Sequence, residues 1–172
     1  MRGSGLEPLV DCVIEDARWQ VLGLEPLANR AVVATLTALE LPLVGYTICV
    51  MGCDDARIAT LNAAFRGKPT ATNVLSWPAD DLSPDAEGDE PYLPGEGDPE
   101  DPLTLGDLAL AYETCAREAA QAEKPMADHV THLVIHGLLH CLGYDHMSDG
   151  DAARMEGLEA QILASLGLPD PY

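Results

Sequence analysis

Four of the five histidines in this sequence lie within one short window, at His132, His136, His140 and His146. His136 and His140 are four residues apart in a predicted helix, so both imidazoles leave the same face, one turn apart. At that separation two ring nitrogens can bind one metal ion at ~2.0–2.1 Å each. Gly143 is a residue that ends helices, and it allows the chain to turn back. His146 follows three residues later and is the candidate third ligand.

Three protein ligands leave one coordination position open for water, as in catalytic rather than structural zinc sites. A divalent ion lowers the pKa of such a water toward ~7. The sequence therefore predicts one divalent ion, with zinc as the expected metal, on His136, His140 and His146. Cys141 lies about 100° around the helix from His140 and is not expected to be a ligand. His132 lies on the same face one turn earlier and could support a ligand without binding the metal, but we expect it to be packed or capped. We expect His129, at the start of the helix, to be solvated.

The spacing His-x-x-x-His-x-x-Gly-x-x-His also occurs in metzincin proteases, which makes a zinc peptidase an alternative function. The protease motif requires a glutamate directly after the first histidine, where it acts as the general base. This sequence has Gly137 at that position. Asp145 is a possible substitute for the missing carboxylate, but nothing in the sequence places it near the metal.

Charge restricts the function classes further. The chain has 172 residues and a net charge of −20, from 29 acidic and 9 basic residues. This excludes a globally basic nucleic-acid binder and a protein held to anionic lipid by charge alone. Residues 80–103 are rich in acids and prolines and predict an acidic flexible loop. The longest stretch without an acid, residues 56–79, contains Arg57, Arg66 and Lys68, which indicates one local cationic site.

The composition also bears on location. No apolar run is near the length that spans a membrane, and the N-terminus lacks the layout of a signal peptide. Five cysteines without a tight framework are typical of reduced thiols. We therefore expect a cytoplasmic protein.

Strand and helix signals alternate along the chain and predict one mixed α/β or α+β domain with few strands. Strands are expected at residues 8–15, 43–51, 73–77 and 105–111. Helices are expected at residues 17–39, with a break near Gly23 or Pro26, and at 54–65, 114–123, 125–142 and 149–166.

The string His136-Gly-Leu-Leu-His140-Cys-Leu-Gly143-Tyr-Asp-His146 closely resembles the signature of the YbeY family of bacterial endoribonucleases, which are rRNA maturation factors. The family writes it as His-Gly-x-Leu-His-x-x-Gly-Tyr-Asp-His. Residues 61–68, 72–78 and 105–108 resemble further family blocks, in the same order. Two departures are Asn73, where the family usually has Asp, and Trp77 in place of Phe.

This resemblance implies a single compact zincin-like α+β domain over residues 1–172, with about four strands in a small mixed sheet and about five helices. It implies single-strand-specific, metal-dependent cleavage of RNA, in maturation of the small-subunit rRNA 3′ end and in ribosome quality control. It also marks Arg66 as the important residue outside the ligands and His136 as the first metal histidine. We therefore expect Arg66 and His136 to be catalytic, and Arg66 and Lys68 to bind RNA.

An arginine suits this role because its guanidinium binds phosphate oxygens through two parallel bonds and offsets charge that develops during RNA cleavage. The alternative for Arg66 is a solvated side chain that interacts favourably with the dipole at a helix C-terminus. The expected partners are single-stranded rRNA and the ribosome or a ribosomal protein, with no membrane and no DNA. Besides the peptidase, a non-catalytic ribosome-assembly factor with a structural metal is the remaining alternative.

Overall fold

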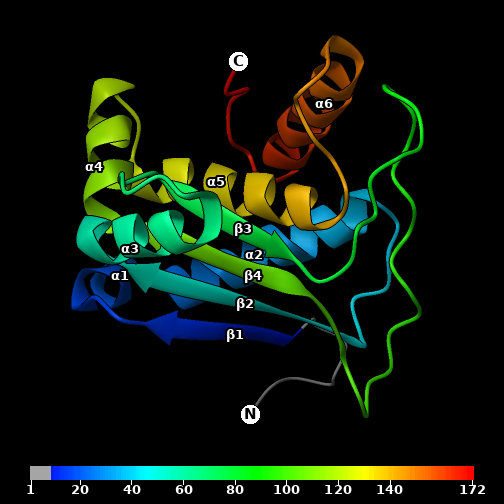
Figure 1. Ribbon diagram of the computed structural model, residues 1–172, viewed down its shortest axis with the longest axis horizontal. Coiled ribbons are helices and arrows are strands. Elements are labelled where there is room, and N and C mark those ends of the chain that lie inside the picture. The colour runs from blue at the N-terminus through cyan, green and yellow to red at the C-terminus, as the bar shows by residue number, and fades with distance from the viewer. Residues whose placement is uncertain (1–8) are drawn as a thin grey trace.

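The computed structural model describes residues 9–172 and contains a four-stranded mixed sheet with the strand order β1-β2-β4-β3 (Figure 1). The parallel pairs are β1 with β2 and β2 with β4, whereas β3 runs antiparallel to β4. β1 and β3 are the edge strands. The strands are β1 (Leu9–Ile14), β2 (Tyr46–Cys53), β3 (Val74–Pro78) and β4 (Leu103–Ala111).

The helices lie within about two residues of the predicted positions, but the described residues contain six rather than five. Gly23 has φ +87°, which ends one helix and begins the next, so the break predicted near Gly23 or Pro26 is at Gly23. The helices are α1 (Ala17–Leu22), α2 (Leu24–Ala38), α3 (Asp55–Arg66), α4 (Tyr112–Gln121), α5 (Met126–Cys141) and α6 (Asp149–Ser165). None of the helices in residues 9–172 is both long and apolar enough to cross a membrane.

The sheet separates two hydrophobic cores of unequal size. The large core lies between the sheet and α2 and α5, with α6 packed on the outside of those two helices. The small core lies under α3 and contains Ile58, Leu75 and Ala109. Helices therefore cover both faces of the sheet, and the expected α+β domain is confirmed.

α5 passes close to the sheet at Gly137. A Cβ atom at this position would lie 2.7 Å from Leu108 Cδ2 of β4, so only glycine allows this approach without repacking. The apolar face of the helix, which includes Val134, Ile135 and Leu138, is fully buried. That burial fixes the rotation of α5, and it leaves the face with His136 and His140 only partly covered.

Gly143 ends the turn after α5 and directs the chain toward His146. Its φ is +97°, and an added Cβ would lie 2.5 Å from the carbonyl oxygen of Leu82. Glycine is therefore required here for two reasons. The backbone has a positive φ, and the acidic segment (residues 80–103) passes close to this position.

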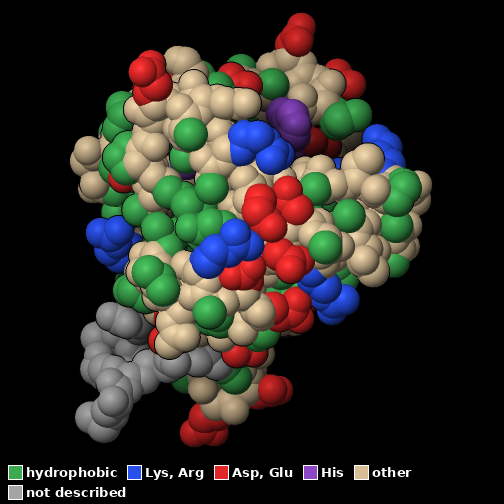
Figure 2. Space-filling model, turned by 90° about the vertical axis from the view of Figure 1, so that its left-hand side faces the viewer, with side chains coloured by type: hydrophobic (Ala, Val, Ile, Leu, Met, Phe, Trp, Pro, Cys, Tyr) green, Lys and Arg blue, Asp and Glu red, His purple; other side chains and the backbone are tan. Residues whose placement is uncertain are grey.

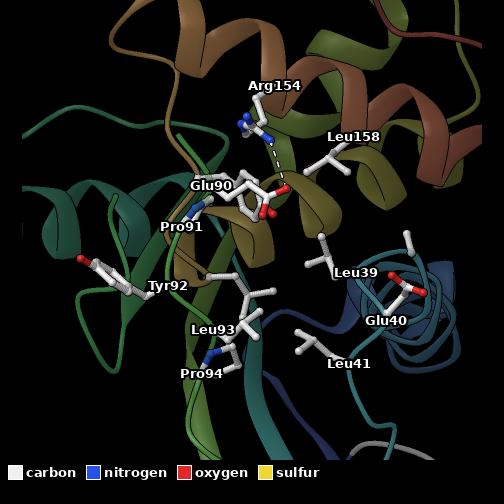
Figure 3. Close-up of a pocket in the computed structure, with 13 residues that line it drawn as sticks. Leu39, Glu40, Leu41, Glu90, Pro91, Tyr92, Leu93, Pro94, Arg154 and Leu158 are labelled. Carbon is white, nitrogen blue, oxygen red and sulfur yellow. Dashed lines mark ion pairs between the residues drawn. The ribbon is translucent and has the colours of Figure 1, made fainter. Parts of the chain in front are cut away.

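The acidic segment is fixed to the body of the protein at several points. Gly88 N donates to Asp151 Oδ1 at 2.8 Å, Arg154 Nη2 donates to Gly88 O at 2.8 Å, and Tyr46 Oη donates to Gly95 O at 2.9 Å. Figure 3 shows the pocket of about 280 Å³ between residues 90–94, the end of α2 and α6, with the Arg154–Glu90 ion pair at 3.6 Å. Leu103, expected to end the loop, already belongs to β4. Flexibility of this segment stays a prediction.

The two constraints on Gly143 predict a large loss of stability for Gly143→Ala. Strain at positive φ costs about 1–2 kcal/mol, and overpacking against Leu82 adds about 1–3 kcal/mol. Gly167→Ala is the matched control, because Gly167 has φ +77° and nothing within 4 Å of an added Cβ. Urea unfolding should give a clearly lower free energy of unfolding for Gly143→Ala than for Gly167→Ala. Equal values would show that the contact with Leu82 does not constrain this turn.

Candidate metal centre

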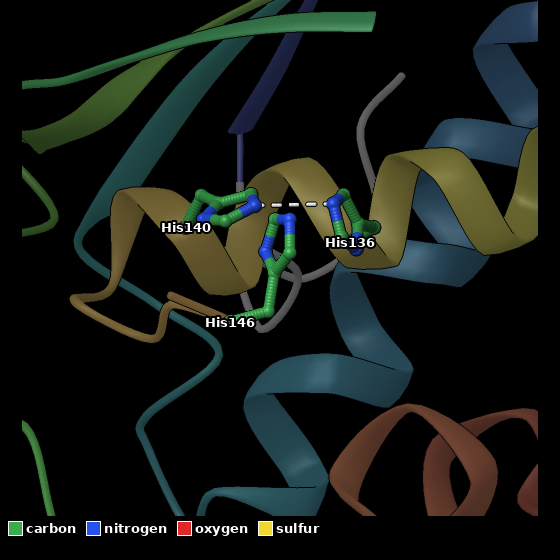
Figure 4. Close-up of side chains that lie close together, drawn as sticks. All are labelled: His136, His140 and His146. Atoms are coloured by element: carbon green, nitrogen blue, oxygen red, sulfur yellow. Dashed lines mark hydrogen bonds between the residues drawn. The ribbon is translucent and has the colours of Figure 1, made fainter. Parts of the chain in front are cut away.

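The three predicted ligands lie together at the end of α5 (Figure 4). One ring nitrogen from each of His136, His140 and His146 lies within 4.8 Å of the others. The Nε2 atoms of His136 and His140 are 3.0 Å apart. The first two residues come from α5, and His146 reaches the site from the segment before α6, with its side chain 52% exposed.

Hydrogen bonds fix the tautomers of the two helical histidines. The carbonyl oxygen of Tyr144 can only accept, so His140 donates from Nδ1 to it at 3.0 Å. His136 donates from Nδ1 to the carboxylate of Glu159, with both oxygens at 3.2 Å. In each neutral ring the Nε2 atom therefore carries a lone pair and no hydrogen.

Two Nε2 lone pairs that face each other at 3.0 Å repel unless a cation lies between them or one ring takes up a second proton. Burial, together with the nearby His136 and His146, lowers the pKa of His140 to about 4. His140 is therefore neutral at pH 7, which is the form that binds a metal. The donor set and its tautomers fit one divalent ion, which His136, His140 and His146 could hold together.

Glu159 is a site residue that the sequence analysis missed. Its side chain is fully buried, and it accepts hydrogen bonds from His136, from His132 Nε2 at 2.6 Å and from Tyr172 Oη at 2.8 Å. Burial would raise the pKa of Glu159, but the hydrogen bonds from His132 and His136 outweigh it and lower the pKa to about 2. A carboxylate behind a metal-binding histidine fixes the ring and increases its basicity.

A signal for Glu159 was present in the sequence. It lies on the apolar face of α6 with Met155, Ile162 and Leu163, where an acid needs a buried partner. His132, His136 and Glu159 are also close enough to hold an ion. The hydrogen bonds already occupy that carboxylate, which favours the three-histidine group as the candidate metal site.

The structure also shows the surroundings of four residues near the site that the sequence analysis discussed. His132 is packed, as expected. The expectation that His129 is solvated is wrong: its side chain is 13% exposed, and Nε2 lies 2.9 Å from Glu118 Oε1, because α4 packs against the start of α5. Asn73 donates from Nδ2 to the same Glu118 oxygen at 3.0 Å, which an ionised aspartate could not do. Cys141 is buried away from the cluster, and burial raises the pKa of its thiol to about 12.

Arg66 and the three histidines line one cleft of about 620 Å³. Arg66 is the last residue of α3, and Gly67 with φ +71° ends that helix. It forms no ion pair with any acid of residues 9–172, whereas Arg57 on the same helix pairs with Glu15 at 3.2 Å.

Lys68 is exposed and does not line the cleft. Figure 2 shows that acids and bases are interspersed on the face over α1, α3 and α4, without a large basic patch.

A group of three histidines that line an open cleft is typical of a metal-dependent hydrolase. Residues 14–167 match the family model described as endoribonuclease YbeY. The chain belongs to this family, whose members are named as endoribonucleases.

Individual relatives agree with this assignment. The chain is 62% identical to the endoribonuclease YbeY of Dinoroseobacter shibae over 163 residues, covering 95% of this chain and 90% of that protein. It is 59% identical to the one from Cereibacter sphaeroides, covering 97% of this chain and all of that protein. The solution structure of TM1509 from Thermotoga maritima has the same fold, with a TM-score of 0.55, 16% identity and 92% coverage of both chains.

The ligand assignment predicts that His140→Ala loses its metal. The protein purified with zinc should contain about one ion per chain, and the variant should contain far less, because one of three ligands is removed. Cys141→Ser is the matched control from the adjacent position, and it should retain the metal because Cys141 faces the core. Metal analysis by mass spectrometry checks both proteins. Unchanged stoichiometry in His140→Ala would contradict the assignment.

The contacts of Glu159 predict weaker metal binding in Glu159→Gln. The amide carries no charge and offers one acceptor oxygen to donors from three residues, so His136 is less firmly oriented. Loss of such a partner typically lowers metal affinity about 10–100-fold. Competition with a chromophoric chelator measures the affinity for zinc. Glu156→Gln removes the same charge from the same helix and should change little; equal effects of the two substitutions would indicate a general charge effect instead.

Proposed function

We propose that this protein is a metal-dependent endoribonuclease that cleaves single-stranded RNA, in maturation of the small-subunit rRNA 3′ end and in ribosome quality control. The observation that carries the proposal is that Arg66 and the three histidines line one open cleft, in a chain that belongs to the endoribonuclease YbeY family. Zinc is the proposed ion, since imidazole ligands and an open position suit it.

Each residue has a distinct role in this proposal. His136, His140 and His146 hold the ion, and Glu159 orients His136 through its Nδ1 hydrogen. A divalent ion at this position supplies a Lewis acid and a bound water of lowered pKa. Arg66 binds the scissile phosphate through its two-pronged guanidinium and stabilises the negative charge that develops there. Lys68, two residues beyond, contacts a neighbouring phosphate.

The peptidase alternative has little support in this geometry. A glutamate in place of Gly137 would first have to displace Leu108, which is fully buried. The candidate substitute, Asp145, lines the cleft, but one of its oxygens accepts a hydrogen bond from His146 N at 2.7 Å. The assembly-factor alternative requires a closed structural site, whereas His146 is half exposed in an open cleft.

The proposed partners are rRNA, the ribosome or a ribosomal protein, in the cytoplasm, rather than DNA or a membrane. A net charge of −20 gives weak non-specific attraction to RNA. At ~0.15 M salt, charges beyond roughly 8 Å are largely screened, so the acids of the segment that lie far from the cleft cost little while Arg66 and the ion act at short range. Asp80 and Asp81 lie closer, because they line a neighbouring pocket together with His140. Selection of the target must then depend on local contacts or on a partner.

The role of Arg66 predicts a larger loss of rate than of binding in Arg66→Ala. One positioned donor to a developing charge contributes ~2.7–4 kcal/mol, or roughly 10²–10³ in rate. Metal content and melting temperature should change little, since Arg66 is neither a ligand nor part of a core. Arg66→Lys should recover only part of the rate, because an ammonium cannot form two parallel bonds. Single-turnover cleavage of a single-stranded RNA oligonucleotide measures the rate, and fluorescence anisotropy measures binding.

Arg57→Ala is the matched control, from the same helix but outside the cleft, and it should cleave at the wild-type rate. If Arg66 only interacts with the dipole of α3, Arg66→Ala would lose less than ~1 kcal/mol of stability and no activity. Full activity in Arg66→Ala would therefore contradict the phosphate contact.

A further inference from the structure

Phe65, the only phenylalanine of the chain, lines the cleft and is 47% exposed as a residue. It is on the last turn of α3, next to Arg66. Its ring packs against Trp77 of β3, with the ring centroids 5.1 Å apart and the planes tilted by 49°. Trp77 itself packs against the small core under α3. The phenylalanine ring is thus supported from one side while much of its surface stays open.

The position of this ring relative to Arg66 matches the chemistry of a nucleotide. The guanidinium carbon of Arg66 lies 5.8 Å from the centroid of the Phe65 ring. A nucleotide offers a negatively charged phosphate and a flat apolar base within the same short reach. The cleft edge therefore presents a cation for the phosphate and an aromatic surface for the base at adjacent residues.

We propose that Phe65, supported by Trp77, is a stacking platform for one unpaired base of the RNA next to the scissile phosphate. This inference rests on the proposed function and adds a base-binding subsite to it. Base–aromatic stacking is tolerant of sequence and contributes about 5–150-fold in affinity per base. Stacking does not depend on charge. It can therefore contribute to RNA binding in this protein, whose net charge of −20 weakens binding through phosphate contacts.

The same subsite gives a physical reason for single-strand specificity. A base inside a duplex is stacked on both faces by its neighbours, so it cannot also stack on Phe65. Only an unpaired base can leave the stack and contact the ring. Single-stranded RNA would then be positioned by Phe65 and Arg66 together, whereas a duplex would reach Arg66 alone.

The test compares zinc-loaded wild type with Phe65→Leu on an intact RNA and on a series of abasic RNAs. Leucine keeps an apolar contact to Trp77 but has no aromatic face. One single-stranded oligonucleotide is intact, and the others lack the base at one position flanking the cleavage site. Wild type should cleave one of these abasic RNAs about 5–150-fold less efficiently in kcat/KM. Phe65→Leu should show a similar loss on the intact RNA and little further loss on that abasic RNA.

Phe65→Tyr should restore cleavage, and Tyr92→Leu, which replaces another exposed aromatic residue outside the cleft, should not change it. Wild-type efficiency of Phe65→Leu on intact RNA would overturn the proposal, as would equal losses for both proteins on every abasic RNA. Quenching of a 2-aminopurine base in the oligonucleotide tests stacking without cleavage. If wild type does not cleave RNA, the proposed function fails, and stacking is then decided by whether wild type, but not Phe65→Leu, quenches the base.

Discussion

The buried carboxylate of Glu159 is the interaction on which the site most depends. A fully buried ionised group is stable only when donors surround it, and here they come from α5 and from the C-terminal residue. These bonds join α6 to α5 and at the same time set the tautomer of His136. The stability of the packed helices and the tautomer of the first candidate ligand therefore have a common physical cause.

α5 has to satisfy two requirements, and its sequence separates them by helical face. One face is apolar and fully buried against the sheet and α2, with Gly137 permitting the close approach to Leu108. The other face carries His132, His136 and His140 at one-turn spacing. Because burial of the first face fixes the rotation of the helix, it also fixes the direction in which the imidazoles of the second face leave it. Such preorganisation reduces the entropy that binding would otherwise cost.

The distribution of charge explains how an acidic chain could act on RNA. Many of the acids lie in the segment between β3 and β4, and other acids form ion pairs with basic residues at the starts of α1 and α3. At the cleft, Arg66 forms no ion pair with an acid of the described residues. The guanidinium of Arg66 is thus available in the cleft, although Asp145 lines the same cleft, and only charges within a short, screened distance act there.

The sequence by itself was sufficient for what depends on short-range pattern. The spacing of His136 and His140, the helix-ending Gly143 and the run of strand and helix signals predicted the ligand group and nearly every element, because helical periodicity and capping are local properties. Five predicted helices became six at Gly23, where one positive φ divides a continuous pattern. The family resemblance, on blocks of local sequence, supplied Arg66.

What only the tertiary structure decided concerns residues far apart in the chain. Glu159 meets His136 across 23 positions, and His129 meets Glu118 because two helices pack side by side. Phe65 packs against Trp77 because α3 covers the face of the sheet on which Trp77 packs against the small core. Local periodicity does not predict such pairs. They form where separate elements pack their apolar faces together, because the polar groups buried between those elements need hydrogen-bond partners.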